Sequence, residues 1–322
     1  MTLEWTPRGQ HTCFPIHLLL ANQTVEKIGK QVCCPCRFDP AQPLIETAAC
    51  LLPVGRAIVW PMEAQLRLAV FIAIFVVVAL AEWVRPKRGL AQSWMTRWRI
   101  NLTIFVIDVL VLRFTLGAAA FAAAVYAQGQ GWGLFGWLNG PGWLEGIIAV
   151  VLLDFAIYLQ HVLSHALPGF WRLHRVHHLD LDVDLTTGLR FHPGEILISM
   201  LYKVALVAAL GPDPWAVVVY EAILNGSALY THGNVALPVP VDRALRWVLC
   251  TPDMHRVHHS TIPVETNSNY GNFLSVWDRL CGTYRAAPEL GHDGIEIGLR
   301  EEQAQAKLGL GRLLVMPFHD RR

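Results

Sequence analysis

The feature that most limits the fold of this chain is an apolar run, LRLAVFIAIFVVVALAEW, over residues 66–83. Its length is close to the roughly 20 residues that an α-helix needs to cross the hydrocarbon of a bilayer. Comparable stretches cover residues 101–127 and 143–166, and shorter ones cover 196–210 and 215–230. The composition agrees, because 53% of the 322 residues are hydrophobic and only 16% are charged, which is unusual for a soluble domain. We therefore predict an all-α integral membrane protein with about four transmembrane helices.

Charges in the loops predict how these helices are oriented. The loop between the first two spans is basic, whereas residues 128–142 contain no Lys or Arg. The basic residues are Arg85, Lys87, Arg88, Arg97 and Arg99. Because cytoplasmic loops are enriched in Lys and Arg, the first loop is expected in the cytoplasm and the second outside. His165 and His232 then fall on the cytoplasmic side, and we expect a bacterial inner membrane rather than the endoplasmic reticulum.

The two ends of the chain differ from its apolar middle. Residues 1–61 show no sustained periodicity and carry Lys and Arg that the predicted topology would place outside, against the usual charge bias. We expect them to be an appendage, either disordered or outside the natural reading frame. A membrane domain over 62–318 and a short tail over 319–322 complete the expected organisation. The net charge of +1 gives no sign of a nucleic-acid partner, which would require a strongly basic face.

Eight of the fourteen histidines (two, three and three) form tight clusters. They are His161 and His165, then His174, His177 and His178 in HRVHH, and His255, His258 and His259 in a second HRVHH. Residues at i, i+3 and i+4 share one face of a helix, so each pentapeptide is expected to present its imidazoles in one direction. Burying so many titratable rings beside a membrane is costly unless a metal occupies their lone pairs. We predict that these histidines bind metal.

The number of imidazoles predicts two metal ions. A tetrahedral zinc site takes four ligands and an octahedral ion takes six. His232 follows a span with a polar end and is expected to be a further ligand, and His192 is expected to be a ligand or to lie next to one. Imidazole suits iron, zinc, copper and nickel alike. The apolar helices lack the Glu-x-x-His pairs of carboxylate di-iron bundles, so the residues alone leave the identity of the metal open.

Six segments resemble the sterol desaturase and fatty acid hydroxylase superfamily of membrane di-iron oxygenases. They are DFAIYLQHVLSH, WRLHRVHH, TTGLRFHPGE, THGNVALP, TPDMHRVHHS and NYGNFLSVWDRLCGTY. The resemblance runs from about residue 62 to 318 and implies a cytoplasmic helical cap on a four-helix stem, with two irons between them and His232 as a separate ligand. Some relatives have another histidine where this chain has Ala228, so we expect water held by Asn225, or His192, to fill that coordination position.

The resemblance implies an enzyme that uses O2 and two iron ions to hydroxylate or desaturate a C–H bond of a membrane lipid, such as a sterol, fatty acyl or sphingoid lipid. An external donor of the ferredoxin or cytochrome type is expected, because the chain has no haem, flavin or iron–sulfur motif. Residues near the boxes are expected to orient the imidazoles or pack around them, or to serve as ordinary caps. They are Asp154, Tyr158, Asp180, Asp182, Asp184, Asp253 and Asn269. A membrane metal transporter and a zinc-dependent membrane hydrolase remain as alternatives.

Overall fold

The computed structural model describes residues 54–138, 140–300 and 309–319. Most of the expected N-terminal appendage therefore lies outside the described residues, as do the last three residues of the expected tail. One compact unit, Trp60–Arg322, contains every side chain discussed below. Its described residues form helices and no strand, which confirms the predicted all-α fold.

Four stretches of helix are long and apolar enough to cross a membrane, which confirms the expected number of spans. They are Met62–Val84, Trp94–Trp137, Gly142–Ala166 and Pro193–Leu210. The helices that form them are α2 (Val54–Val84), α3 (Trp94–Thr115), α4 (Ala119–Gln130), α5 (Leu134–Trp137), α6 (Gly142–Ala166) and α8 (Pro193–Leu210). On α2, Leu68, Val77 and Leu80 are more than half exposed. Large apolar patches of this kind mark a surface that another apolar phase covers, here the bilayer.

The second span is not the single helix that its apolar sequence predicts. Helix α3 ends at Thr115 and α4 begins at Ala119. Between them Gly117 has a φ of +53°, in the left-handed region that glycine adopts without steric cost. Uniform hydrophobicity predicts burial in lipid, but it does not predict the direction of the backbone, so the break was missed.

The long helices pack around a core of small and apolar side chains. Helix α9 (Pro214–Thr231) contacts α4 and α6, and α8 contacts α3 and α4. Ala124, Leu153, Val207 and Tyr220 meet in the centre of this group and are almost completely buried. Asp213 caps the start of α9 by accepting a hydrogen bond from the backbone N–H of Trp215, as short polar residues do before a helix.

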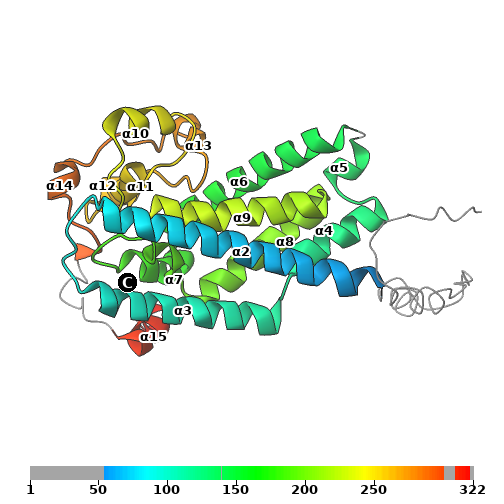
Figure 1. Ribbon diagram of the computed structural model, residues 1–322, viewed down its shortest axis with the longest axis horizontal. Coiled ribbons are helices and arrows are strands. Elements are labelled where there is room, and N and C mark those ends of the chain that lie inside the picture. Colours follow the sequence, from blue (N-terminus) through cyan, green and yellow to red (C-terminus); the bar gives the residue numbers. More distant parts are fainter. Residues whose placement is uncertain (1–53, 139, 301–308, 320–322) are drawn as a thin grey trace, which may run out of the picture. The chain divides into compact units, whose positions relative to one another are not determined.

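Shorter helices gather around one end of the bundle of long helices, while α5 lies towards the other end (Figure 1). They are α7 (Pro168–His178), η1 (Thr187–Leu189), α10 (Val239–Leu245), α11 (Pro252–His258), α12 (Pro263–Thr266), α13 (Val276–Leu280), α14 (Gly291–Gly294) and α15 (Leu310–His319). Helices α7 and α11 both begin with proline, whose fixed φ suits the first helical turn. Both carry an HRVHH pentapeptide, so the histidines lie at this end of the bundle.

Candidate metal centre

The nine histidines predicted as ligands come together in two groups. His161, His165, His174, His178 and His258 form the first, which we call the five-histidine group. His177, His232, His255 and His259 form the second, the four-histidine group. Within each group, one ring nitrogen from every histidine lies within 4.8 Å of the others. The groups are neighbours, since the ring centroids of His178 and His259 are 4.6 Å apart.

Each HRVHH pentapeptide contributes to both groups. In α7, His174 and His178 belong to the five-histidine group and His177 to the other. The second pentapeptide reverses this division, with its middle histidine in the five-histidine group. From the sequence, the three imidazoles of each pentapeptide were expected to point in one direction. With 3.6 residues per turn, side chains at i and i+4 are about 40° apart around the axis, whereas i+3 and i+4 are about 100° apart, which separates the middle histidine from its neighbour.

In the five-histidine group, the loop after α12 orients three rings. The Nδ1 atom of His161 lies 2.7 Å from the carbonyl oxygen of Tyr270, and that of His258 lies 2.8 Å from the carbonyl oxygen of Ser268. His165 Nδ1 lies 3.3 Å from Oδ1 of Asn267. A ring that donates from Nδ1 turns the lone pair of Nε2 towards a metal. This loop therefore directs three Nε2 atoms into one group.

A carboxylate orients the fourth ring. Glu195 Oε1 lies 2.7 Å from Nδ1 of His174, the arrangement that raises the basicity of a metal-binding imidazole. Glu195 lies in the first turn of α8, where His192 is the N-cap and Pro193 the first residue. Glu195 was not among the residues that the sequence predicted to orient imidazoles. The only available signal was its place in the RFHPGE segment, three residues after His192.

In the four-histidine group, three Nε2 atoms converge. Those of His177 and His255 each lie 3.1 Å from Nε2 of His232. His232 Nδ1 lies 2.6 Å from the carbonyl oxygen of Ala228, so its proton is on that side and its Nε2 carries a lone pair. Three ring nitrogens that lie this close together form a donor set that suits one cation. Gly188 permits this arrangement, because a Cβ atom there would lie 2.4 Å from the Ala228 oxygen.

Burial keeps these imidazoles neutral. It lowers the pKa of His232 from an ordinary 6.5 to about 4. Burial, followed by the neighbouring histidines, lowers the pKa of His177, His178 and His258 well below the ordinary value. Metal ligation requires the neutral ring. Among the described residues, nothing bonds to Nε2 of four members of the five-histidine group, namely His161, His165, His174 and His258. The donors therefore fit two metal ions.

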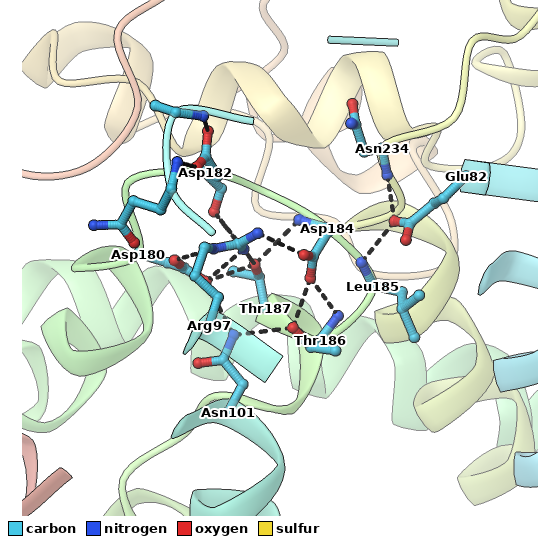
Figure 2. A network of polar contacts seen from close by, with 12 residues as sticks. Glu82, Arg97, Asn101, Asp180, Asp182, Asp184, Leu185, Thr186, Thr187 and Asn234 are labelled. Atoms are coloured by element: carbon cyan, nitrogen blue, oxygen red, sulfur yellow. Dashed lines mark hydrogen bonds and ion pairs between the residues drawn. The ribbon is translucent and has the colours of Figure 1, made fainter. Parts of the chain in front are cut away.

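Of the two roles expected for the aspartates after α7, orienting imidazoles or serving as ordinary caps and loop carboxylates, the structure shows the second. Figure 2 shows that they surround Arg97 of α3. The guanidinium donates to both carboxylate oxygens of Asp180 and to Asp184, and Asp182 accepts from the backbone N–H groups of Ala91 and Gln92. Burial alone would raise the pKa of Asp180, but Arg97 holds it below its ordinary value. Removing one member of such a buried cluster is strongly destabilising, because it leaves an uncompensated buried charge.

The same network holds the loop that carries Gly188 (Figure 2). Thr187 donates to Asp180, and Asn101 donates to Asp180 and Thr186. Glu82 of α2 accepts from the backbone N–H groups of Leu185 and Asn234. The cluster thus joins α2 and α3 to two segments. One is the loop after α7, and the other contains Asn234, two residues after His232.

Three of the remaining predicted site residues bond to partners other than the imidazoles. Asp154 accepts from the indole of Trp277 at 2.8 Å, Tyr158 shares a hydrogen bond with Thr283, and Asp253 pairs with Lys87 and Arg256. Asn269, with a φ of +52°, donates to the carbonyl oxygens of Met254 and Arg285. It therefore shapes the loop that orients His161 and His258.

His192 lies outside both groups. Its Nδ1 accepts from the backbone N–H of Gly194, and its Nε2 lies 3.0 Å from the carbonyl oxygen of Leu314. Both nitrogens are thus engaged, and the ring serves as the N-cap of α8. Asn225 and Ala228 both line the cavity beside His232, which is compatible with the expected water position.

A cavity of about 240 Å³ reaches both histidine groups. His161 and His174 line it from one group, and His177 and His232 from the other. Its remaining walls come from α3, α6, α8, α9 and η1, together with Phe191 and Asn272, and most of the lining is apolar. A mostly apolar cavity with a few polar groups is the usual form of a small-molecule site.

Residues 146–283, which contain all nine histidines, match the fatty acid hydroxylase family. The ornithine lipid hydroxylase OlsE of Rhizobium tropici is 31% identical over 183 residues, 55% of this chain and 51% of that protein. The alkylglycerol monooxygenase of Xenopus tropicalis is 31% identical over 134 residues, 41% of this chain and 28% of that protein. The cholesterol 25-hydroxylase of Rattus norvegicus is 26% identical over 144 residues, 44% of this chain and 47% of that protein.

The matched segments span about half of these relatives or less. No solved structure matches the chain. The matching region coincides with the helices and loops that bring the two histidine groups together. Over the residues that hold its histidine boxes, the chain is thus similar to the fatty acid hydroxylase family, in agreement with the resemblance to the sterol desaturase and fatty acid hydroxylase superfamily that its motifs carry.

Proposed function

We propose that the protein is an O2-dependent di-iron hydroxylase that acts on a C–H bond of a membrane lipid. The observation that carries the proposal is the pair of adjacent histidine groups, which open into one mostly apolar cavity. These relatives are hydroxylases and monooxygenases, which favours insertion of oxygen over desaturation.

The nine imidazoles would hold two iron ions, one in each group. Bound iron would supply the redox chemistry that activates O2. The chain's own part is to orient the ligands through their Nδ1 hydrogen bonds and to keep the reacting carbon away from water. Phe105, Leu112 and Ile157 provide apolar walls for a hydrocarbon chain, and a dry site prevents side reactions.

The reaction needs electrons from elsewhere. Hydroxylation converts R–H, O2, two electrons and two protons into R–OH and water. The sequence has no haem, flavin or iron–sulfur motif of its own, so a ferredoxin or cytochrome partner would supply the electrons.

We place the histidine groups on the cytoplasmic side of a bacterial inner membrane. The basic loop between α2 and α3 lies against the histidine end, since Lys87 Nζ is 2.8 Å from Oδ2 of Asp253. The segment without Lys or Arg approaches the α8–α9 turn instead, because a Cβ atom on Gly211 would lie 2.0 Å from the carbonyl oxygen of Trp132. The charge difference between the two loops then follows the usual bias.

Labelling tests this topology. Gly89→Cys and Gly129→Cys, each in a cysteine-free background, place a thiol where the structure has open space. An impermeant maleimide added to intact cells should label the thiol at position 129 and not the one at 89. The reverse pattern would contradict the topology.

Metal and lipid analysis test the function. The purified protein should contain about two irons per chain, and membranes with the protein should convert a lipid into a product heavier by one oxygen atom when O2 and a reductant are present. Stoichiometric zinc without O2-dependent change would favour a hydrolase, and metal uptake without lipid oxidation would favour a transporter. Either result contradicts the proposal.

A further inference from the structure

One acidic side chain of the membrane helices faces the cavity without a partner. Asp108, in α3, is only 4% exposed, and its Oδ1 atom has no hydrogen-bond partner among the described residues. It lines the cavity that reaches the histidines. An unsatisfied buried carboxyl destabilises the fold, and an acidic residue inside a membrane usually has a function.

Buried ionisable groups elsewhere on the membrane helices have partners. Lys203 of α8 donates to Glu221 of α9 at 2.8 Å, and Glu82 accepts two backbone N–H groups. The fold therefore satisfies buried charges at other depths of the bundle. The lack of a partner at Asp108 is specific to the wall of the cavity.

The cavity offers no cation to this carboxyl. Its described lining contains two acidic residues, Asp108 and Glu195, and no Lys or Arg. Glu195 already accepts from His174 and so lies beside the proposed metal. Gln160 and Ser199 bond to each other at 3.2 Å. Of the two lining carboxyls, Asp108 is therefore the one that bonds to no other described residue, and its neighbours Phe105 and Leu112 are apolar.

We propose that Asp108 is a specificity-determining residue that accepts a hydrogen bond from a hydroxyl or ammonium group of the lipid substrate. The inference rests on the proposed function, in which this cavity holds the lipid. A lipid with a donor at the right distance from the reacting carbon satisfies the carboxyl. A lipid without one leaves the carboxyl buried and unpaired, and sites built around a hydrogen bond reject such analogues strongly.

Three simple probes separate the two donor classes: hexadecan-1-ol, hexadecylamine and methyl hexadecyl ether. Equilibrium binding is measured with the full chain in nanodiscs. The unsubstituted protein should bind at least one donor probe roughly 10- to 100-fold more tightly than the ether, because the ether leaves a buried carboxyl without a partner. Asp108→Leu should bind all three alike. Asp108→Asn, which keeps an acceptor oxygen, should retain a preference for the alcohol but lose one for the amine.

Leu112→Ala is the control, because it changes the volume of the same wall without touching a polar group. This substitution should weaken the binding of all three probes to a similar extent. If Asp108→Leu kept the donor preference, or if the unsubstituted protein had none, the proposal would be overturned.

The unfolding temperature of Asp108→Leu shows whether Asp108 recognises the substrate or stabilises the fold. Removing an unsatisfied buried carboxyl should leave the unfolding temperature of Asp108→Leu equal to or above that of the unsubstituted protein, with unchanged metal content. A lower unfolding temperature would make Asp108 structural and refute the inference. Binding needs no turnover, so a donor preference in a protein without iron or oxygenation would refute the proposed function and leave the role of Asp108 standing.

Discussion

The two HRVHH pentapeptides have the same sequence and divide their histidines in opposite ways. The pentapeptide in α7 gives two rings to the five-histidine group and one to the four-histidine group, whereas the pentapeptide in α11 gives one and two. The central valines, Val176 and Val257, are fully buried in both. Local sequence therefore sets the angular spacing of the rings, and the packing of the helix decides which group each ring serves.

The groups that accept a hydrogen bond from Nδ1 of the histidines, which we call their supports, also differ between the two pentapeptides. His174 of the first is oriented by the side chain of Glu195, whereas His258 of the second is oriented by the backbone carbonyl of Ser268. A side-chain support can be removed by one substitution, and a backbone support cannot. The two pentapeptides should thus respond differently to mutation, although their sequences are identical.

The largest effect should follow removal of the middle histidine from either pentapeptide. His177→Ala takes a ligand from the four-histidine group and His258→Ala takes one from the other. Each should abolish lipid oxidation and lower the iron content while the protein remains in the membrane, because loss of a ligand exceeds the roughly 10- to 100-fold effect of losing a support. His292→Ala, outside both groups, should retain activity. Turnover by a doubly substituted His177/His258 variant would disprove the site.

Gly188→Ala should damage one group selectively. The added Cβ atom would lie 2.4 Å from the Ala228 oxygen and 3.1 Å from Nδ1 of His232, so His232 must move. We expect iron loss from the four-histidine group, measured as metal content together with Mössbauer spectra. Gly169→Ala, in α7 with open space around it, is the matched control and should bind iron normally. Equal iron content in both variants would contradict the geometry.

Glu195→Gln tests the unequal supports directly. It should weaken metal binding in the five-histidine group by about 10- to 100-fold in a chelator competition. Ser268→Ala leaves the carbonyl that orients His258 in place and should have little effect on metal affinity. Similar losses in the two variants would mean that the pentapeptides do not differ in this way.

The last prediction concerns acid stability, which does not distinguish the two pentapeptides. Folding lowers the pKa of His232 from 6.5 to about 4, so the unfolded chain binds protons first as the pH falls. The metal-free protein should lose stability from about pH 6.5 downwards, by roughly 3 kcal/mol for this residue once the pH is below 4. Unfolding temperatures at pH 7.5 and pH 5 check this. The metal-loaded protein should be less sensitive to acid. If the stability of the metal-free protein did not depend on pH, the conclusion that the buried histidines are neutral would be contradicted.

Much of this architecture could be predicted because periodicity and composition are local signals. The apolar runs indicated the spans, and the spacing of His161 and His165 and of the two pentapeptides indicated the ligands. The break at Gly117 was missed, since an apolar sequence does not encode where a helix bends. Without the fold, sequence also cannot tell which side chain reaches which ring, so Glu195 was missed.

The acidic residues illustrate the same limit. Asp180, Asp182 and Asp184 follow a histidine box in sequence, and the sequence alone left open whether they bond to imidazoles or serve as ordinary loop carboxylates. In the fold Arg97, more than eighty residues earlier, reaches two of them. A buried guanidinium requires such partners, but only the contact between α3 and this loop identifies them.

The most direct test is the metal content of a crystal of the purified protein, located by anomalous scattering at the iron absorption edge. We predict two iron peaks, one among the rings of His161, His165, His174, His178 and His258 and one among those of His177, His232, His255 and His259. A single peak, a zinc signal in place of iron, or rings that point away from one another would contradict the di-iron centre.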